Sequence, residues 1–550
     1  MLGFFGGETF IMHQAQVINL AQLLVQTARL HPKRPGLIRA DQAWTWRELE
    51  ARTSAMAKAL QDLGVQPGDR ILSHSRNILQ TFELGWIAWR MGCVWVPTNF
   101  RLTPGEVAYL GESSGATVMI YEEGFEDHAD AVAAVSSALK FRVVIRASDR
   151  ALSSGEHDYE SMVYLHLPEM LRLPPGDGFE PVQVEYDTPA WFFYTSGTTG
   201  KPKAAVLTHG QMAFVVTNHL ADLIPQTTEE DCSIVVAPLS HGAGVHAMLN
   251  VARGAASVLM PGEKLDPEVF WRLVQKHRVT NLFTVPTIVK VLVEHPAVDR
   301  YDHSSLRYVI YAGAPMYRTD QKLALQKLGK VLVQYFGLGE VTGCITVLPR
   351  HMHSADDTDP DANIGSCGRP RTGMEVAILD AQMQRLPAGE IGEICVRGAA
   401  VFLGYFGNEE ATAKALRGGW FHTGDLGRLD ERGLLYITGR ESDMYISGGS
   451  NVYPREVEEV LLEHPEVLEV AVLGVPDPKW GEVGVAVVVR RDPSIVVTAE
   501  QLYAHLEGRC ARYRWPKSFF FWDALPKSGY GKITKKDVRQ ILIERGEIAA

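Results

Sequence analysis

The first two thirds of the chain alternate between amphipathic stretches and short apolar runs. Apolar residues recur at helical spacing in 18–32 and in 45–64, where Thr45 and Glu48 form a capping box. The second stretch has one apolar face, made by Leu49, Ala55, Met56, Ala59 and Leu60. Strand-like apolar runs follow at 70–75, 94–99, 116–121 and 142–146. This alternation continues to about residue 380 and predicts α/β structure in layers, with parallel sheets.

The pattern changes towards the C-terminus. Short strands separated by glycine turns predict a small β-rich subdomain over 374–438. A polar connector, 439–443, then precedes helices and strands that form an α+β unit of ordinary domain size. We therefore divide the chain into a large N-terminal domain (1–439), a hinge (440–442) and a small C-terminal domain (443–550).

Composition excludes several classes of protein. Of the 550 residues, 46% are apolar and 22% charged, as in soluble globular proteins. A formal charge of −11 without a long basic run disfavours nucleic acid as a partner. The first residues resemble neither a signal peptide nor an anchor, and no apolar window is long enough for a transmembrane segment, so we expect a cytoplasmic protein. The six cysteines stand singly, and we expect reduced thiols and no zinc site.

The stretch YTSGTTGKPK, 194–203, has the composition of a phosphate-binding loop. Its hydroxyls donate hydrogen bonds, Gly197 and Gly200 admit close approach of backbone N–H groups, and Lys201 and Lys203 bring positive charge. It is not a Walker loop, because too few residues separate the glycines and Pro202 follows the lysine. Taken alone, it is also compatible with a surface loop that binds nothing.

Six further stretches occur in a fixed order with this loop: PLSHGAGV (238–245), YAGAPM (311–316), FGLGE (336–340), GWFHTGDLGRLDERG (419–433), ITGRESDMYISGGSNVYPREVE (437–458) and LPKSGYGKITK (525–535). Together the seven blocks resemble the adenylate-forming superfamily of acyl-CoA synthetases, luciferase-like enzymes and peptide adenylation domains. The resemblance covers nearly the whole chain. It implies an N-terminal adenylation domain, a mobile C-terminal lid, and ATP, Mg²⁺ and coenzyme A as ligands.

The same resemblance implies roles for individual residues. Phe336 stacks on adenine, Glu340 binds Mg²⁺, Asp425 accepts both ribose hydroxyls, and Arg440 contacts ribose or phosphate. The remaining nucleotide-binding positions are Thr195, Ser196, Gly197, Thr198, Thr199, Gly200, Lys201, Gly313, Ala314, Pro315 and Gly337. From the residues alone, Glu340 could equally be an exposed acid and the TGDLG run a plain turn between strands.

Two positions depart from the family pattern, Gly339 and Ser442. Gly339 stands where relatives usually carry Thr, which removes a hydroxyl donor to phosphate that water or Thr342 would have to replace.

The lid carries the catalytic lysine of the resemblance. Lys532 is expected to bridge the substrate carboxylate and the α-phosphate, where one positive charge reduces the repulsion between two anions. Gly448, Gly449 and Trp480 match positions that line the thiol tunnel, although a Trp is by default a core residue. Ser442 stands at the hinge, where most relatives carry Asp or Lys.

The acyl substrate is expected near His241, which stands at the family's gate position. A histidine satisfied within its loop is the alternative. The surrounding positions are small or apolar: Val245, Thr284, Val285, Pro286, Ala312, Gly313, Ala314 and Leu338. An amino acid and a dicarboxylate are therefore disfavoured, and a small-to-medium aliphatic or aryl carboxylic acid is favoured.

The leading hypothesis is an ATP-dependent acid:CoA ligase. The alternatives are a free-standing adenylation enzyme that loads a carrier protein, and a catalytically silent nucleotide-binding relative. A lysine acetyltransferase and a deacetylase are candidate partners, because acetylation of Lys532 would remove its charge. A homodimer stays open, since nothing in the sequence gives the oligomeric state.

Overall fold

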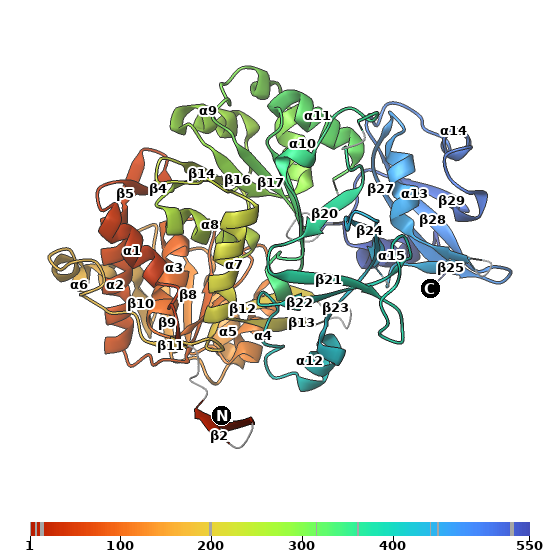
Figure 1. The fold of residues 1–550 in the computed structure, drawn as a ribbon. Coiled ribbons are helices and arrows are strands. Elements are labelled where there is room, and N and C mark those ends of the chain that lie inside the picture. Colours follow the sequence, from red (N-terminus) through yellow and green to blue (C-terminus); the bar gives the residue numbers. More distant parts are fainter. Residues whose placement is uncertain are drawn as a thin grey trace.

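The computed structural model describes residues 2–5, 8–11, 16–196, 201–314, 316–359, 362–440, 442–447, 450–527 and 533–549. It confirms the predicted α/β layering: two large sheets and their helices form the main body, and a smaller sheet with helices forms the C-terminal unit (Figure 1). Two short antiparallel pairs complete the strands, β1 (Leu2–Phe5) with β2 (Glu8–Ile11) and β3 (Gln16–Val17) with β11 (Val184–Glu185).

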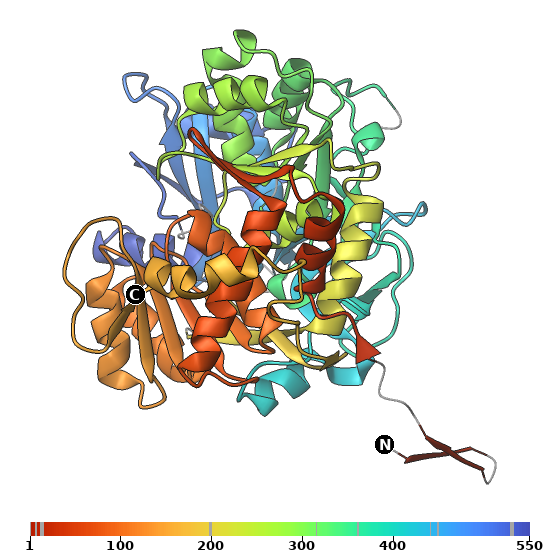
Figure 2. The same ribbon diagram turned by 90° about the vertical axis from the view of Figure 1, so that its left-hand side faces the viewer.

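The first sheet has seven strands in the order β10-β9-β8-β6-β7-β12-β13. Its neighbours are parallel except β12 and β13, which pair antiparallel at one edge. The strands are β6 (Arg70–His74), β7 (Val94–Pro97), β8 (Val118–Glu122), β9 (Phe141–Ile145), β10 (Glu156–Asp158), β12 (Pro189–Ser196) and β13 (Pro202–Thr208). The helices of this half are α1 (Gln22–Leu30), α2 (Trp46–Asp62), α3 (Leu79–Arg90), α4 (Pro104–Ser114), α5 (Glu126–Val135), α6 (Tyr159–Met170) and α7 (His209–Asp222). In Figure 2 the strands of this sheet from β6 to β10 are orange.

The second sheet is a path of 13 strands in the order β21-β22-β23-β24-β20-β19-β18-β17-β16-β14-β15-β4-β5. The parallel part contains β4 (Pro35–Arg39), β14 (Cys232–Val235), β15 (Ala256–Leu259), β16 (Asn281–Thr284), β17 (Tyr308–Tyr311) and β18 (Leu332–Phe336), with β5 (Gln42–Thr45) antiparallel at the edge. The antiparallel part contains β19 (Thr346–Leu348), β20 (Ser366–Pro370), β21 (Met374–Leu379), β22 (Gly392–Gly398), β23 (Phe421–Leu429) and β24 (Leu435–Arg440). The predicted β-rich subdomain therefore continues the second sheet through β20.

The helices that accompany the second sheet are α8 (Gly242–Arg253), α9 (Pro267–His277), α10 (Pro286–Glu294), α11 (Arg318–Leu328) and α12 (Glu409–Ala415). The largest hydrophobic cluster draws side chains from both sheets, among them Trp95 and Trp191 from the first and Phe283 from the second. The two sheets thus share one core, which fixes their edges relative to each other.

Helix α2 differs from its expected form. Its capping box of Thr45 and Glu48 is confirmed, but the helix is buried on nearly every side rather than on one apolar face. Its polar residues are paired inside the protein: Arg52 binds Glu83, and Glu50 accepts from Arg90 at 2.9 Å. Buried charges persist only with such partners, so the tertiary environment overrides the amphipathic pattern.

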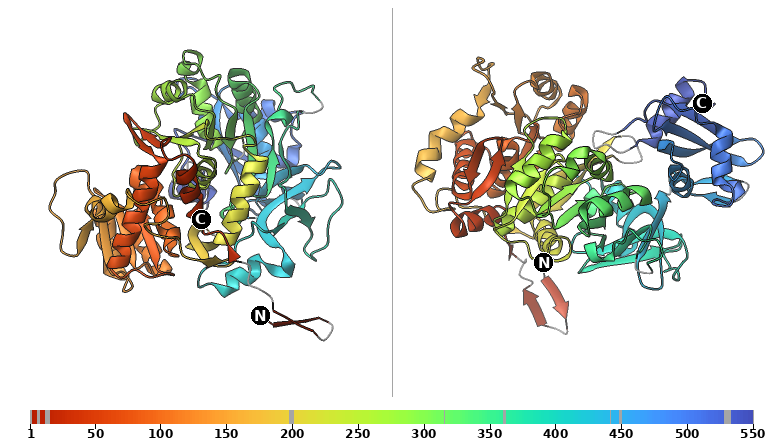
Figure 3. Two further views of the ribbon diagram at one scale, coloured as in Figure 1. Left: turned by 60° about the vertical axis from the view of Figure 1, so that its left-hand side comes forward. Right: turned by 90° about the horizontal axis from the view of Figure 1, so that it is seen from above.

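The C-terminal unit has a five-stranded sheet of β25 (Tyr445–Ser447), β26 (Ser450–Val452), β27 (Val467–Asp477), β28 (Gly481–Arg490) and β29 (Ser518–Trp522). Its helices are α13 (Pro454–Leu462), α14 (Ala499–Leu506) and α15 (Lys535–Glu544). Figure 3 shows it from above as a separate blue body beside the main one. Arg455 of α13 donates to the Ile437 carbonyl of β24 at 3.3 Å, so the two bodies touch at this point.

Two further findings concern the cysteines and the lengths of the helices. All six cysteines are unpaired, and five of them are buried. Among the helices that the structure describes, none is both long enough and apolar enough to cross a lipid bilayer. The division of the chain at residues 440–442 stays a prediction.

Candidate active site

The candidate residues gather at the carboxyl edge of the second sheet. Strands β14, β16, β17 and β18 are parallel, and their C-terminal ends lead into 236–241, 285–286, 312–314 and 337–340. Because parallel strands end at one edge, these loops lie side by side. Ligands of open α/β sheets bind in the crevice at this edge.

The edge hairpin of the first sheet meets this edge at Glu340. Strands β12 and β13 pair with each other, and Thr195 stands opposite Lys203 in this pairing. The two strands flank the phosphate-loop sequence. The Thr195 hydroxyl donates a hydrogen bond of 3.1 Å to Glu340 Oε1. Glu340 is only 5% exposed, so its interpretation as an exposed acid is wrong. The predicted phosphate loop and the predicted metal ligand are thus in direct contact.

The carboxylate of Glu340 suits Mg²⁺ as a ligand. Its Oε1 accepts from hydroxyl groups, whereas Oε2 accepts no hydrogen bond from the residues that the structure describes. A carboxylate oxygen without a partner, beside a phosphate-loop sequence, is the kind of ligand that a hard divalent cation takes. The residues present therefore fit the metal that the resemblance implies.

At two positions of this edge, Gly313 and Gly337, the backbone requires glycine. Gly313 follows β17 with a φ of +83°, a conformation that favours glycine. A Cβ at Gly337 would lie 2.4 Å from the Cα of Gly343, so the backbone segments approach too closely for a side chain. Ala314 and Phe336, at the ends of β17 and β18, are both half-buried. These predicted nucleotide-binding positions follow or end two neighbouring strands, because β17 and β18 pair in parallel with Tyr311 opposite Gln334.

Asp425 and Arg440 also come together. Asp425 lies within β23 and is 5% exposed, so the plain turn between strands is wrong. Arg440 pairs with it in register on β24, and its Nε lies 3.2 Å from Asp425 Oδ1. Asp425, which the resemblance assigns to ribose, and Arg440, which it assigns to ribose or phosphate, thus form one ion pair at the border of the C-terminal unit.

A cluster of Glu393, Cys395 and His422 lies next to Asp425 on strands β22 and β23. The ligand atoms of Glu393, Cys395 and His422 lie within 4.8 Å of one another, which the spacing of the cysteines did not predict. Their polar atoms are already engaged, because His422 Nδ1 lies 2.7 Å from Glu393 Oε2 and Arg417 binds the same carboxylate at 3.0 Å. Glu393 Oε1 also accepts from the Gly424 N–H at 3.2 Å. The cluster therefore holds the strand segment that presents Asp425.

His241 lies beside the aromatic ring of Phe193. Its ring centroid is 4.6 Å from that of Phe193, and the rings of Phe283 and Tyr335 stack at 5.8 Å. Gly242 brings the start of α8 against Phe283, because a Cβ there would lie 2.6 Å from that ring. Asn77 fastens the preceding loop by two hydrogen bonds of 2.9 Å, to Ala237 and Leu239.

Several predicted site residues lie outside the described residues: Gly197, Thr198, Thr199, Gly200, Pro315, Gly448, Gly449 and Lys532. Ser196 is described only as the last residue of β12. Trp480 is described, and it is 50% exposed in the turn between β27 and β28, so its interpretation as a core residue is wrong. The roles of all these residues stay predictions.

Comparison with known proteins decides the family. A model described as "AMP-binding enzyme" matches residues 24–406, and one described as "AMP-binding enzyme C-terminal domain" matches residues 456–532. The chain belongs to the AMP-binding enzyme family. This confirms the resemblance found in the sequence.

Relatives of this AMP-binding enzyme include a feruloyl-CoA synthase of an Amycolatopsis species, 36% identical over 518 residues, which cover 94% of this chain and 97% of the relative. An indoleacetate–CoA ligase of Aromatoleum aromaticum is 30% identical over 96% of this chain and 99% of its own. Among solved structures, ATP-bound MatB from Rhodopseudomonas palustris has a TM-score of 0.82 at 29% identity, covering 96% of this chain and 99% of that one. The amide bond synthetase McbA from Marinactinospora thermotolerans has a TM-score of 0.82 at 28% identity, with coverages of 95% and 99%.

The structure explains the departure at Gly339 in this AMP-binding enzyme. A Cβ at Gly339 would lie 2.6 Å from Phe193 Cδ1 and 2.9 Å from Thr195 Cγ2. The Phe193 ring therefore fills the space that a threonine side chain would occupy. The hydroxyl of Thr342, the expected substitute, is buried without a hydrogen-bond partner among the described residues.

Gly339→Ala is expected to lower the free energy of unfolding by about 1–3 kcal/mol, because the new methyl group overpacks a filled site. Denaturant unfolding measures this change. Gly105→Ala is the matched control, since a Cβ there meets no atom within 4 Å. Adding Phe193→Leu should recover part of the loss. Equal stability of the Gly339 and Gly105 variants would contradict the assignment.

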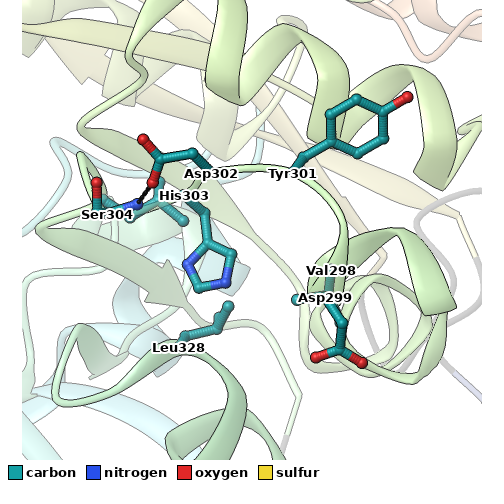
Figure 4. A pocket seen from close by; sticks show the side chains of 8 residues that line it. Val298, Asp299, Tyr301, Asp302, His303, Ser304 and Leu328 are labelled. Atoms are coloured by element: carbon teal, nitrogen blue, oxygen red, sulfur yellow. Dashed lines mark hydrogen bonds between the residues drawn. The ribbon is translucent and has the colours of Figure 1, made fainter.

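A surface cavity of about 420 Å³ lies away from these residues, between η1 (Pro296–Asp299), the loop after it and Leu328 of α11 (Figure 4). Its acids are engaged: Asp302 accepts from the Ser304 N–H at 2.9 Å, and Asp299 binds Lys327 at 2.6 Å. None of the predicted site residues lines it. The carboxyl edge of the second sheet is therefore the candidate active site.

Proposed function

We propose that this AMP-binding enzyme is an ATP-dependent acid:CoA ligase. In the first half-reaction a carboxylate oxygen of the substrate attacks the α-phosphorus of ATP, and pyrophosphate leaves. In the second, the CoA sulfur attacks the acyl carbonyl carbon, AMP leaves, and the thiol proton passes to solvent. The contact of Thr195 with Glu340 carries the proposal, because it brings a hydroxyl-rich loop to a carboxylate whose Oε2 accepts no hydrogen bond from the described residues.

The residues divide the work by their chemistry. Glu340 Oε2 would hold Mg²⁺, which when bound neutralises phosphate charge. Asp425 would accept the two ribose hydroxyls through its two oxygens, and the guanidinium of Arg440 would turn from Asp425 to the nucleotide. Phe336 would stack on adenine, and Lys532 would neutralise the two reacting anions.

The two half-reactions require different faces of the C-terminal unit. We propose that 443–550 acts as a lid that rotates about the hinge 440–442, with Ser442 as the pivot. Strand β24 ends at Arg440 and β25 begins at Tyr445 in a different sheet, which supports a pivot between them. Gly448, Gly449 and Trp480 would then line the path of the pantetheine arm.

The substrate is a carboxylic acid of small-to-medium size, and an aryl acid is favoured over an aliphatic one. The Phe193 ring beside His241 and the Phe283 ring beside Gly242 support this, since aromatic faces pack well on a flat ring. Relatives named for feruloyl-CoA and indoleacetate point the same way.

A panel of acids tests the substrate: acetate, hexanoate, octanoate, benzoate, cinnamate and 4-hydroxycinnamate, each assayed for CoA-dependent AMP formation. We expect the highest kcat/KM for an aryl acid. A maximum at octanoate would replace the aryl assignment with an aliphatic one, and no turnover of any acid with ATP bound would favour the catalytically silent relative.

The acyl acceptor needs a separate test. Purified acyl-AMP is offered to free CoA, to a phosphopantetheinylated carrier protein and to an amine, since a solved neighbour is an amide bond synthetase. We expect rapid transfer to CoA. Transfer to the carrier protein alone would favour a loading enzyme.

A further inference from the structure

The segment 400–406 connects the phosphate-loop hairpin to Glu340. Three backbone hydrogen bonds of 2.9–3.1 Å join it to β13. A fourth, of 2.8 Å, runs from the Phe402 N–H to the backbone carbonyl of Glu340. The segment therefore fixes the main chain of the proposed metal ligand relative to the strand that follows the loop.

The side chain of Tyr405 reaches the carboxylate itself. Its hydroxyl donates to Glu340 Oε1 at 2.8 Å, the oxygen that also accepts from Thr195 at 3.1 Å. Both donors act on one oxygen. The other, Oε2, accepts no hydrogen bond within the described part of the chain. Two hydroxyls thus set the rotation of the carboxylate and leave one oxygen available for a ligand.

Tyr405 acts as the donor to Glu340. Its partner is a carboxylate oxygen, which accepts hydrogen bonds, so the phenol O–H supplies the hydrogen of this bond. Lys203 Nζ lies over the Tyr405 ring, 5.0 Å from its centroid. The ring thus contacts a cation of the phosphate-loop strand and its hydroxyl binds the carboxylate, so two contacts restrain its position.

We propose that Tyr405 is a positioning residue for the metal site: it holds Glu340 Oε1 so that Oε2 faces the divalent cation bound with the nucleotide. This inference rests on the proposed function, because that function supplies the nucleotide and its metal. The sequence does not suggest it, since Tyr405 lies 65 residues from Glu340 in a stretch without charged or nucleophilic residues.

Tyr405→Phe removes the hydroxyl and keeps the ring, the backbone bonds and the contact with Lys203. Mn²⁺ binding is measured by electron paramagnetic resonance in the presence of α,β-methylene-ATP, which cannot release pyrophosphate. We expect the dissociation constant of Mn²⁺ to rise about tenfold or more, since a hydrogen bond to a charged group is lost. Binding of the metal-free nucleotide should change less than about twofold, because the positioned atom contacts the metal.

Tyr186→Phe is the matched control. Its hydroxyl donates to the Ala399 carbonyl at 3.2 Å, next to the same segment, and among the described residues it makes no hydrogen bond with Glu340. We expect unchanged Mn²⁺ binding. Thr195→Val, which removes the second donor, should weaken Mn²⁺ binding as well, and the double variant should deviate from additivity because both hydroxyls hold one oxygen.

Two results would overturn the inference. Mn²⁺ binding by Tyr405→Phe within about twofold of the unmodified protein would show that the hydroxyl does not position the ligand. An equal loss of metal-free and metal-dependent nucleotide binding would assign Tyr405 to packing. Selective loss of Mn²⁺ binding in a protein that forms no acyl-CoA from any acid would support the inference and refute the proposed function, so the two failures are distinguishable.

Discussion

Lys532→Ala is expected to abolish acyl-AMP formation while sparing thioester formation from preformed acyl-AMP. The lysine is proposed to act where a carboxylate meets the α-phosphate, and only the first half-reaction brings these two anions together. Removing one such electrostatic contact costs about 10²–10³-fold in rate. Pyrophosphate exchange measures the first half-reaction, and CoA-dependent release of AMP from synthetic acyl-AMP measures the second. Acetylation of Lys532 should have the same effect, because it removes the charge.

Lys527→Ala is the matched control for this variant. Lys527 belongs to the same stretch of sequence, but it is engaged by Glu469 of β27. We expect both half-reactions to stay within about threefold of the unmodified enzyme, since a surface ion pair contributes little. Equal losses in both half-reactions for Lys532→Ala would contradict its role in adenylation.

Glu340→Gln is expected to slow adenylation about 100-fold or more without unfolding the protein. The amide oxygen still accepts from Tyr405 and Thr195. The charge that would face Mg²⁺ is lost, and a neutral amide is a weaker ligand for a hard cation. Pyrophosphate exchange at rising Mg²⁺ concentration measures the effect, and the apparent Mg²⁺ requirement should rise.

Glu160→Gln separates stability from function in that experiment. Glu160 pairs with Arg52 at 2.7 Å, away from the predicted site residues. Its variant should unfold more easily, because a partly buried ion pair is broken, yet keep its exchange rate. If Glu340→Gln keeps full exchange at low Mg²⁺, the carboxylate is not the metal ligand.

Local features of the fold were predictable because short-range forces decide them. The Thr45 capping box needs contacts across only three residues, and short apolar runs mark buried strands such as β6 and β8. Sheet order was not predictable. The pairing of β20 with β24, which makes the β-rich subdomain part of the second sheet, joins segments about 70 residues apart.

In the candidate site, too, the residue types were predictable from the sequence and the long-range contacts were not. The residue types of the phosphate loop, of Glu340 and of Asp425 indicate nucleotide chemistry, because hydroxyls, carboxylates and lysines have distinct partners. The contact of Phe193 with Gly339 could not be predicted, since 146 positions separate the two residues in the sequence. The roles of Tyr405 and Asn77 could not be predicted for the same reason, because the residues next to them in the sequence do not indicate what they contact.

By itself, the sequence determined the secondary structure, the family and the chemical types at the site, because these depend on local spacing and on motifs in a fixed order. Only the tertiary structure decided that Glu340 is buried, that Thr195 and Tyr405 hold one of its oxygens, and that Asp425 meets Arg440. These facts follow from how two sheets and a seven-residue segment pack together. Packing joins distant residues by shape and burial, which no local pattern encodes.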